Sequence, residues 1–211
     1  MSKIFEFLMA LITGSSIPVF SSSSALATMI LYVKKKKIQG VIRAFAGGLF
    51  AITLLYVSSS GLHLMIENLI NDNVKLCTIT ILTAAMLIYG LGVAGIFGYP
   101  WYRTPPKSIC EIVEKEPSGS STLLGFILYF RPTIAGSIAI IISTIINSPL
   151  QAIGYFSALY IGITIATIII CYYGAKKIEN ANDYEEFIDK ARKNVGFIIA
   201  TAGFIGLLSI F

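Results

Sequence analysis

Charged residues are scarce in this chain of 211 residues, of which 13% are Asp, Glu, Lys or Arg and 55% are hydrophobic. A soluble globular domain carries about 25% charged residues. Apolar runs recur at the length that a helix needs to cross a hydrocarbon core, about 20 residues. The composition excludes an ordinary soluble domain and predicts an integral membrane protein whose first partner is the lipid bilayer.

Groups that hold metals or carry redox chemistry are also few. Cys77, Cys110 and Cys171 form neither a Cys-x-x-Cys motif nor a close pair, so their spacing defines no disulfide framework and no metal site. His63 stands near the outer end of a predicted span, where we expect a snorkelling interfacial side chain. No Asp or Glu falls deep in a predicted span, which leaves a cation site without its hard ligands. We therefore expect no metal, no cofactor and no catalytic residues.

Six apolar segments are predicted to span the membrane, at residues 4–33, 41–65, 76–97, 123–146, 150–173 and 195–211. The connectors after the first, third and fifth segments hold thirteen of the sixteen basic residues: Lys34, Lys35, Lys36, Lys37, Arg43, Arg103, Lys107, Lys115, Lys176, Lys177, Lys190, Arg192 and Lys193. The positive-inside rule places these connectors in the cytoplasm and both termini outside, in a multi-pass protein of the plasma membrane.

The basic and mixed-charge connectors are interpreted conservatively. The lysine run at residues 34–37 is a topology signal that could contact anionic lipid headgroups, and we assign it no nucleic-acid partner. Residues 179–193 are mixed in sign and are interpreted as a solvated connector, with a short surface helix as the alternative.

The two halves of the sequence resemble each other. Pro18 pairs with Pro132 at an offset of 114 positions, Phe45 pairs with Phe156 at 111, and residues 93–98 pair with 201–206 at 108. A three-span repeat reverses its orientation when it is duplicated, so the halves should be related by a pseudo-two-fold axis in the membrane plane. Small residues should allow close helix contact, namely Gly47, Gly48, Gly92, Gly95, Ala158 and Gly203.

The predicted fold is an all-α polytopic membrane protein with six transmembrane helices in two inverted three-helix repeats. The first repeat covers residues 1–97, a cytoplasmic loop covers 98–121, and the second repeat covers 122–211. Helices 1 and 4 are predicted to be broken at proline.

Proline interrupts the first and the fourth predicted spans. Because proline favours the first position of a helix, Pro18 and Pro132 should each begin a half-helix whose electropositive N-terminus points at the bilayer centre. Arg131 adds a cation there, at a depth where a charge costs about 2.5–3.5 kcal/mol and usually marks a function. The alternative is that Arg131 snorkels or binds carbonyls exposed by the break. The sequence predicts a site for a small anionic or polar solute formed by Ser16, Pro18, Val19, Ser21, Arg131, Pro132 and Thr133.

The six spans, outside termini, inverted halves and two prolines resemble the CcdA/DsbD transmembrane family of cytochrome c biogenesis proteins, which is similar to the LysE-like transporters. In that family a cysteine follows each proline, and the two thiols carry reducing equivalents across the membrane. Here Val19 and Thr133 occupy those positions, so the redox reaction does not carry over.

The resemblance implies a transporter-like carrier that is not an enzyme. Two alternatives stay open at this point. One is a non-catalytic assembly or interaction component in cytochrome c or envelope biogenesis, with a membrane or redox protein as partner. The other is residual transmembrane thiol–disulfide electron transfer through Cys77, Cys110 or Cys171.

Overall fold

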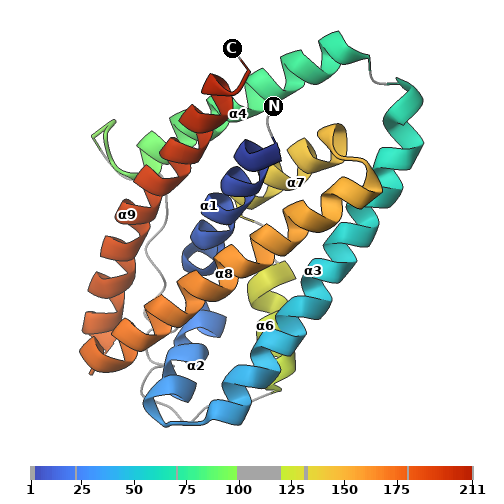
Figure 1. Ribbon diagram of the computed structural model, residues 1–211. Coiled ribbons are helices and arrows are strands. Elements are labelled where there is room, and N and C mark those ends of the chain that lie inside the picture. The colour runs from blue at the N-terminus through green and yellow to red at the C-terminus, as the bar shows by residue number, and fades with distance from the viewer. Residues whose placement is uncertain are drawn as a thin grey trace.

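The computed structural model describes residues 3–21, 23–69, 71–98, 120–130, 133–179 and 181–210, and within these ranges it contains helices and no strand (Figure 1). In chain order the elements are α1 (Lys3–Ser21), α2 (Ser23–Lys34), α3 (Ile38–Ile66), the short 3-10 helix η1 (Glu67–Leu69), α4 (Asp72–Val93), α6 (Ser121–Phe130), α7 (Ile134–Ile146), α8 (Pro149–Lys177) and α9 (Ala181–Leu208).

Four helical segments are long and apolar enough to cross a bilayer: Ile38–Leu69, Asp72–Val93, Pro149–Lys177 and Asn182–Leu208. Two bent pairs meet the same condition jointly, α1 with α2 at an angle of 89° and α6 with α7 at 70°. By length and composition the described chain therefore has four spans, or up to six if each bent pair crosses once. The prediction of an all-α, multi-pass membrane protein is confirmed at this level.

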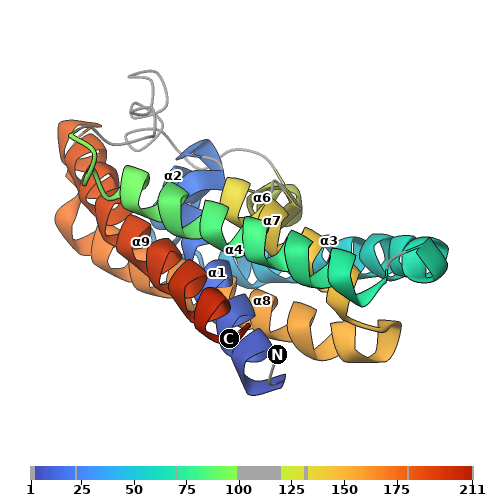
Figure 2. The ribbon, with the colours of Figure 1, turned by 90° about the horizontal axis from the view of Figure 1, so that it is seen from above.

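The helices form an elongated bundle with two distinct ends (Figures 1 and 2). The beginning of α1 and the end of α9 lie side by side at one end, and the turns α2–α3 and α8–α9 lie at the other. Lys34 Nζ donates a hydrogen bond of 2.8 Å to Ile178 O and so ties those two turns together.

Two apolar clusters fill the interior. The larger joins α1, α2, α3, α6, α7, α8 and α9 and contains Leu26, Ile30, Tyr129, Leu159 and Ile163, all buried. The smaller joins α1, α4, α7 and α9 through Met9, Met86, Ile142 and Ile199. Large apolar side chains also cover the outside, among them Phe50, Ile81, Ile165 and Phe197, which are about half exposed or more. An apolar exterior is what a hydrocarbon solvent requires.

Three helix pairs approach closely at glycine. A Cβ added at Gly14 of α1 would overlap Leu159 O of α8, and one at Gly125 of α6 would overlap Ala44 O of α3. In the pair formed by α4 and α9, a Cβ at Gly90 would overlap Ala200 N. Small residues let helix backbones meet in membranes, where no hydrophobic driving force acts between helices. The expected role in close packing is confirmed for Gly47, Gly48 and Gly203, whose added Cβ atoms would overlap Thr122, Tyr129 and Leu87 respectively.

The first break differs from its prediction. Pro18 lies inside α1, which continues to Ser21, and the bend of 89° is between α1 and α2. The prediction that Pro18 begins a half-helix is therefore wrong. A helix in a membrane tolerates an internal proline because neighbouring helices help to satisfy the freed backbone groups. Here α1 is packed against α8 one turn before the proline, at Gly14.

The connector at residues 179–193 also differs. Residues 181–193 form the first half of α9, which runs without interruption into the last span. Tyr184, Ile188 and Arg192 are buried along it. Their spacing of four residues places them on one helical stripe, and this stripe continues into Val195 and Ile199 of the span. The prediction of a solvated connector is therefore wrong, because the segment is an amphipathic helix with one buried face.

Candidate functional site at the helix breaks

The first break is formed by the end of α1. Ser16 is buried, and its Oγ donates to Thr13 O at 2.7 Å. Val19 is 2% exposed, and Pro18 is buried beside it. Ser21 is the last residue of α1. The hydroxyl of Ser16 is thus occupied by its own helix, while the last carbonyls of α1 are left for other partners, as at any helix C-terminus.

The second break lies at the start of α7. Thr133 has extended backbone angles and caps this helix, because its Oγ1 accepts a hydrogen bond of 3.1 Å from Gly136 N. Thr133 is only 8% exposed, so the electropositive N-terminus of α7 lies inside the bundle. Arg131 and Pro132, predicted at this break, lie outside the described residues, and the side chain of Ser21 does as well.

The start of α7 packs against the C-terminal part of α1, at Ile17. A Cβ added at Gly136 would stand 3.2 Å from Ile17 Cδ1, so the first turn of α7 packs against α1 between Ser16 and Pro18. The smaller apolar cluster encloses this contact, since it includes Val19 together with Ala135 and Ile138 of α7. Of the predicted site residues, the structure thus brings the Ser16–Val19 stretch and Thr133 into one region.

A buried arginine that the sequence prediction missed completes this region. Arg192 of α9 is 5% exposed, and its Nε donates to Val19 O at 3.3 Å. Its guanidinium carbon lies 5.9 Å from the centre of the Phe20 ring. The C-terminal end of a helix carries partial negative charge and favours a cation. Arg192 therefore places a positive charge at the interrupted end of α1.

The signal for Arg192 was present in the sequence. It stands four positions after Ile188 and three before Val195, which is the spacing of one helix face. The prediction assigned Arg192 to a basic connector, and charge alone does not indicate a buried helix face. A buried arginine near the end of a membrane helix is costly unless it is paired or functional.

Two buried threonine hydroxyls lie in the interior of the bundle, on α1 and α4. Thr13 Oγ1 is buried one turn before Ile17, and no hydrogen bond to it is found within the described residues. Thr83 of α4, also fully buried, donates to Ile79 O at 2.7 Å. Because Thr83 donates its hydrogen to its own helix, Thr13 Oγ1 is the one of these two hydroxyls that can donate to a small anion or polar molecule.

A separate polar cluster joins α3 to α7. Ser59 Oγ lies 2.7 Å from Thr144 Oγ1, and His63 Nδ1 lies 2.8 Å from Thr144 O. Since a carbonyl oxygen only accepts, Nδ1 carries a hydrogen. His63 is 6% exposed, so the prediction of a snorkelling interfacial side chain is wrong. Its position at the packed α3–α7 contact, and not on the lipid-facing side of α3, explains the difference.

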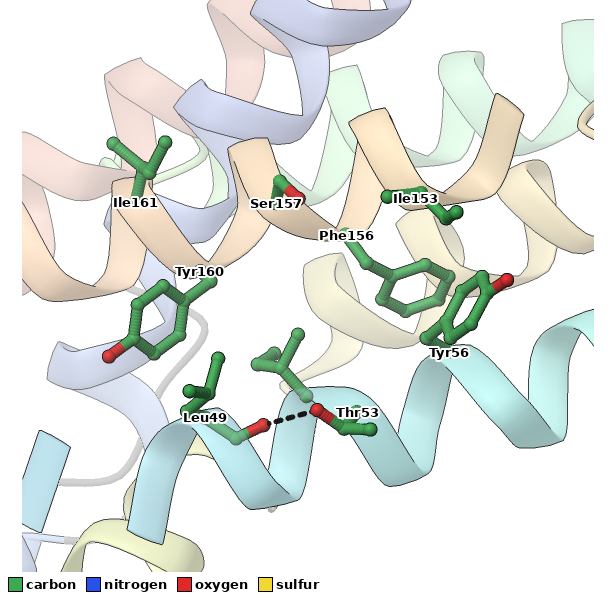
Figure 3. A pocket seen from close by; sticks show the side chains of 9 residues that line it. Leu49, Thr53, Tyr56, Ile153, Phe156, Ser157, Tyr160 and Ile161 are labelled. Atoms are coloured by element: carbon green, nitrogen blue, oxygen red, sulfur yellow. Dashed lines mark hydrogen bonds between the residues drawn. The ribbon is translucent and has the colours of Figure 1, made fainter. Parts of the chain in front are cut away.

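A groove with a volume of about 450 Å³ lies between α3 and α8 (Figure 3). Two tyrosines cross it between the helices: Tyr160 OH donates to Phe45 O and Tyr56 OH to Pro149 O, each at 3.2 Å. Its wall is apolar, and Leu49 and Ile153 on its rim are about half exposed. Such a groove suits hydrocarbon and not a charged solute, so it is distinct from the helix-break region.

Metal ligands and thiols are not assembled in the part of the chain that the structure describes. Within it, no group of three or more His, Cys, Asp and Glu side chains is placed to hold a metal ion. Cys171 of α8 is 1% exposed, Cys77 of α4 is exposed, and both are free thiols. Cys110 lies outside the described residues.

No family model matches the chain, and neither a curated protein nor a solved structure matches it. Membership of the CcdA/DsbD family stays a prediction from the sequence.

Proposed function

We propose that this protein is a membrane carrier for a small anionic or polar solute, built from two inverted halves, α1–α4 and α6–α9. The observations that carry the proposal are the packing of the first turn of α7 on Ile17 of α1 and the hydrogen bond from the buried Arg192 to Val19 O. The N-terminus of α7 and a cation thus both lie against the last turns of α1, before its break. Broken helices at the interface of inverted repeats are where transporters bind their substrates.

Reciprocal packing supports the two-fold relation of the halves. Gly14 of α1 meets α8 in the way that Gly125 of α6 meets α3, and these two glycines stand 111 positions apart. On the opposing helices, Gly162 meets Leu11 O, and Gly47 meets Thr122 O. Helix α1 thus packs on α8, and α6 packs on α3, through the same pair of glycine contacts.

The contact between α4 and α9 has the same pattern from both sides, because a glycine of each helix meets an alanine of the other. A Cβ at Gly90 would overlap Ala200 N and lie 2.7 Å from Gly196 O. A Cβ at Gly196 would overlap Ala94 N and lie 2.9 Å from Gly90 O. Exchanging the two helices at an offset of 106 positions reproduces both contacts. A pair that is unchanged on exchange is expected where a two-fold axis passes between two helices.

Contacts along the bent pairs support six spans. On α3, Ala44 meets α6 and His63 meets α7, and these residues are about 28 Å apart at 1.5 Å per residue. On α8, Leu159 meets α1 and Ile178 O meets Lys34 at the end of α2, over the same length. Each bent pair therefore follows its neighbour for about the 30 Å of a hydrocarbon core, which favours a broken span over a re-entrant loop.

Alternating access follows from this arrangement in physical terms. An anionic solute in this region would be attracted by Arg192 and would accept hydrogen bonds from the α7 N-terminus. The halves are joined along the α1–α8, α3–α6 and α4–α9 seams, and movement at these seams would open the region to either side in turn. Arg131, predicted at the same break, would strengthen the attraction.

The test is flux of small anions into proteoliposomes that contain the full chain. A thermal-shift panel of acetate, lactate, nitrate and inorganic phosphate selects the probe. We expect Arg192→Gln to reduce uptake of that probe at least tenfold, since a hydrogen bond to a charged group contributes about 1.5–3 kcal/mol. Arg131→Ala should reduce it as well.

The matched control is Lys193→Gln, which removes a neighbouring charge that is 48% exposed and paired with Asp189 at 3.2 Å. It should leave uptake unchanged. Full uptake by a folded Arg192→Gln protein, or an unchanged melting temperature with every anion of the panel, would contradict the proposal.

A further inference from the structure

Another hollow, which is polar, lies at the turn between α2 and α3, away from the helix breaks. Its volume is about 450 Å³, and its lining consists of Tyr32, Lys36, Lys37, Ile38, Gln39, Gly40, Arg43 and Ser121. We propose that this turn pocket binds a phosphate group, carried by the headgroup of an anionic lipid. A soluble phosphate ester shares the same chemistry. The lipid is favoured because the pocket lies at the end of helices that are long enough to cross the membrane.

The charge of the turn pocket has one sign. Lys36, Lys37 and Arg43 supply three cations, and none of the lining residues is an Asp or a Glu. Two ion pairs of the described residues, Lys75–Asp72 and Lys193–Asp189, use none of these cations. Three cations that share one hollow repel each other, and a phosphate of opposite charge relieves this repulsion.

The backbone of the turn adds an N–H group that can donate a hydrogen bond to an anion. Lys37 is the N-cap of α3, and its side chain forms no capping hydrogen bond. Ile38 N donates to Lys36 O and Gly40 N to Lys37 O, each at 3.0 Å, whereas no backbone acceptor for Gln39 N is found among the described residues. Gln39 N is therefore the N–H group that the start of this 29-residue helix can offer to an anion. Lys36 has a φ of 53°, in the left-handed region, which turns the chain sharply from α2 into α3. Basic side chains and the α3 N-terminus are thus brought to the same hollow.

The floor of the turn pocket is fixed by packing. Tyr32 is 5% exposed, and a Cβ added at Gly40 would stand 3.1 Å from its Cδ1. Ser121 Oγ donates to Tyr32 OH at 3.1 Å, so the Tyr32 hydroxyl accepts there and keeps its own hydrogen for another acceptor. A rigid hydroxyl donor beside three cations is suited to a phosphate oxygen.

The turn between α8 and α9 offers a matched comparison at the same end of the bundle. A hollow of about 200 Å³ there is lined by Lys177, Asp183, Glu186, Phe187 and Lys190. It holds two lysines but also two carboxylates. The double variant Lys177→Gln with Lys190→Gln removes two positive charges, as does Lys37→Gln with Arg43→Gln. Comparing the two double variants therefore distinguishes binding in the turn pocket from general attraction to a basic surface.

The experiment measures lipid binding to the purified full chain by native mass spectrometry in detergent, with phosphatidylglycerol and phosphatidylcholine as ligands. The wild type should prefer phosphatidylglycerol. Each cation near an anionic lipid surface contributes about a fivefold change in affinity, so Lys37→Gln with Arg43→Gln should weaken phosphatidylglycerol binding by about 25-fold. The α8–α9 pair should change it by less than about threefold, and Lys37→Arg should retain it.

Inorganic phosphate, added to the protein in phosphatidylcholine micelles, distinguishes the source. Thermal protection by phosphate that is lost in Lys37→Gln with Arg43→Gln, without a preference for phosphatidylglycerol, would support the pocket with a soluble ligand. Equal loss in both variant pairs, or binding that is indifferent to all four substitutions, would overturn the proposal. Since these side chains line an open surface turn, circular dichroism should show both pairs folded.

Discussion

Replacing Gly47 with alanine should loosen the seam between α3 and α6. A Cβ at this position would overlap Thr122 O and lie 2.8 Å from Thr122 C and 3.1 Å from Phe126 N. All three are backbone atoms, so no flexible side chain can move aside. The two helices must separate, and Gly125, which meets Ala44 across the same seam, would lose its contact too.

The size of this effect follows from overpacking, which costs about 1–3 kcal/mol when neighbours have to shift. The gain in helix propensity from glycine to alanine, about 1 kcal/mol, offsets a part. For a chain of this length, 1 kcal/mol corresponds to about 2–4 °C in melting temperature. We expect Gly47→Ala to lower the melting temperature of the purified protein by several degrees.

Gly61 provides the control in the same helix, because an added Cβ there meets no atom within 4 Å. Gly61→Ala should leave the melting temperature unchanged or raise it slightly. The same contrast should appear on α8 between Gly162→Ala, which would overlap Leu11 O, and Gly154→Ala, which has open space. Equal melting temperatures for Gly47→Ala and Gly61→Ala would refute the close approach of α3 and α6.

Two further predictions concern the capping threonine and the thiols. Thr133→Ala should lower the free energy of unfolding by about 1 kcal/mol through loss of the α7 cap, whereas Thr133→Ser should retain most of it in the same denaturation assay. In a Cys110→Ser background, a membrane-impermeant maleimide should modify Cys77 in the folded protein, and Cys171, 1% exposed, only after denaturation. Peptide mass spectrometry reads both sites, and rapid modification of native Cys171 would contradict its burial.

The long helices were predictable from the sequence because a bilayer demands apolar runs of a set length. The predicted spans 41–65, 76–97 and 150–173 fall on α3, α4 and α8. Their polar ends were not predictable in the same way. Helix α8 continues to Lys177, and α9 begins at Ala181, because a helix can extend beyond the hydrocarbon core while charged side chains face water.

The helix breaks were predictable only in outline. Proline indicated that the first and fourth apolar runs are interrupted, but the first bend is between α1 and α2 and not at Pro18. Under the proposed two-fold relation, the contacts at Gly14 and Gly125 correspond at an offset of 111 positions, which pairs Pro132 with Ser21. This register differs from the offset of 114 positions predicted from the two prolines, because the approach of helix backbones depends on small residues and not on the residues that interrupt the helices.

The candidate site shows the same limit. Thr133 was predicted from its place after Pro132, and its capping role follows from local chemistry. The spacing of Arg192 from Ile188 and Val195 indicates a buried position if residues 181–193 continue the helix of the last span, as the structure shows. The contact of Arg192 with Val19, distant in the sequence, depends on how α9 crosses α1. Long-range contacts of this kind cannot be deduced from one sequence.

The crossed pairing of α1 with α8 and of α6 with α3 bears on how the protein is made. Neither half can complete its own seams, because Gly14 and Gly47 find their partners in segments that the ribosome synthesises more than 70 residues later. The earlier helices must therefore wait in the bilayer, with their glycine surfaces against lipid, until the later ones arrive. Assembly is then a late, concerted step of biogenesis, and two separately expressed halves would have to find each other before either becomes stable.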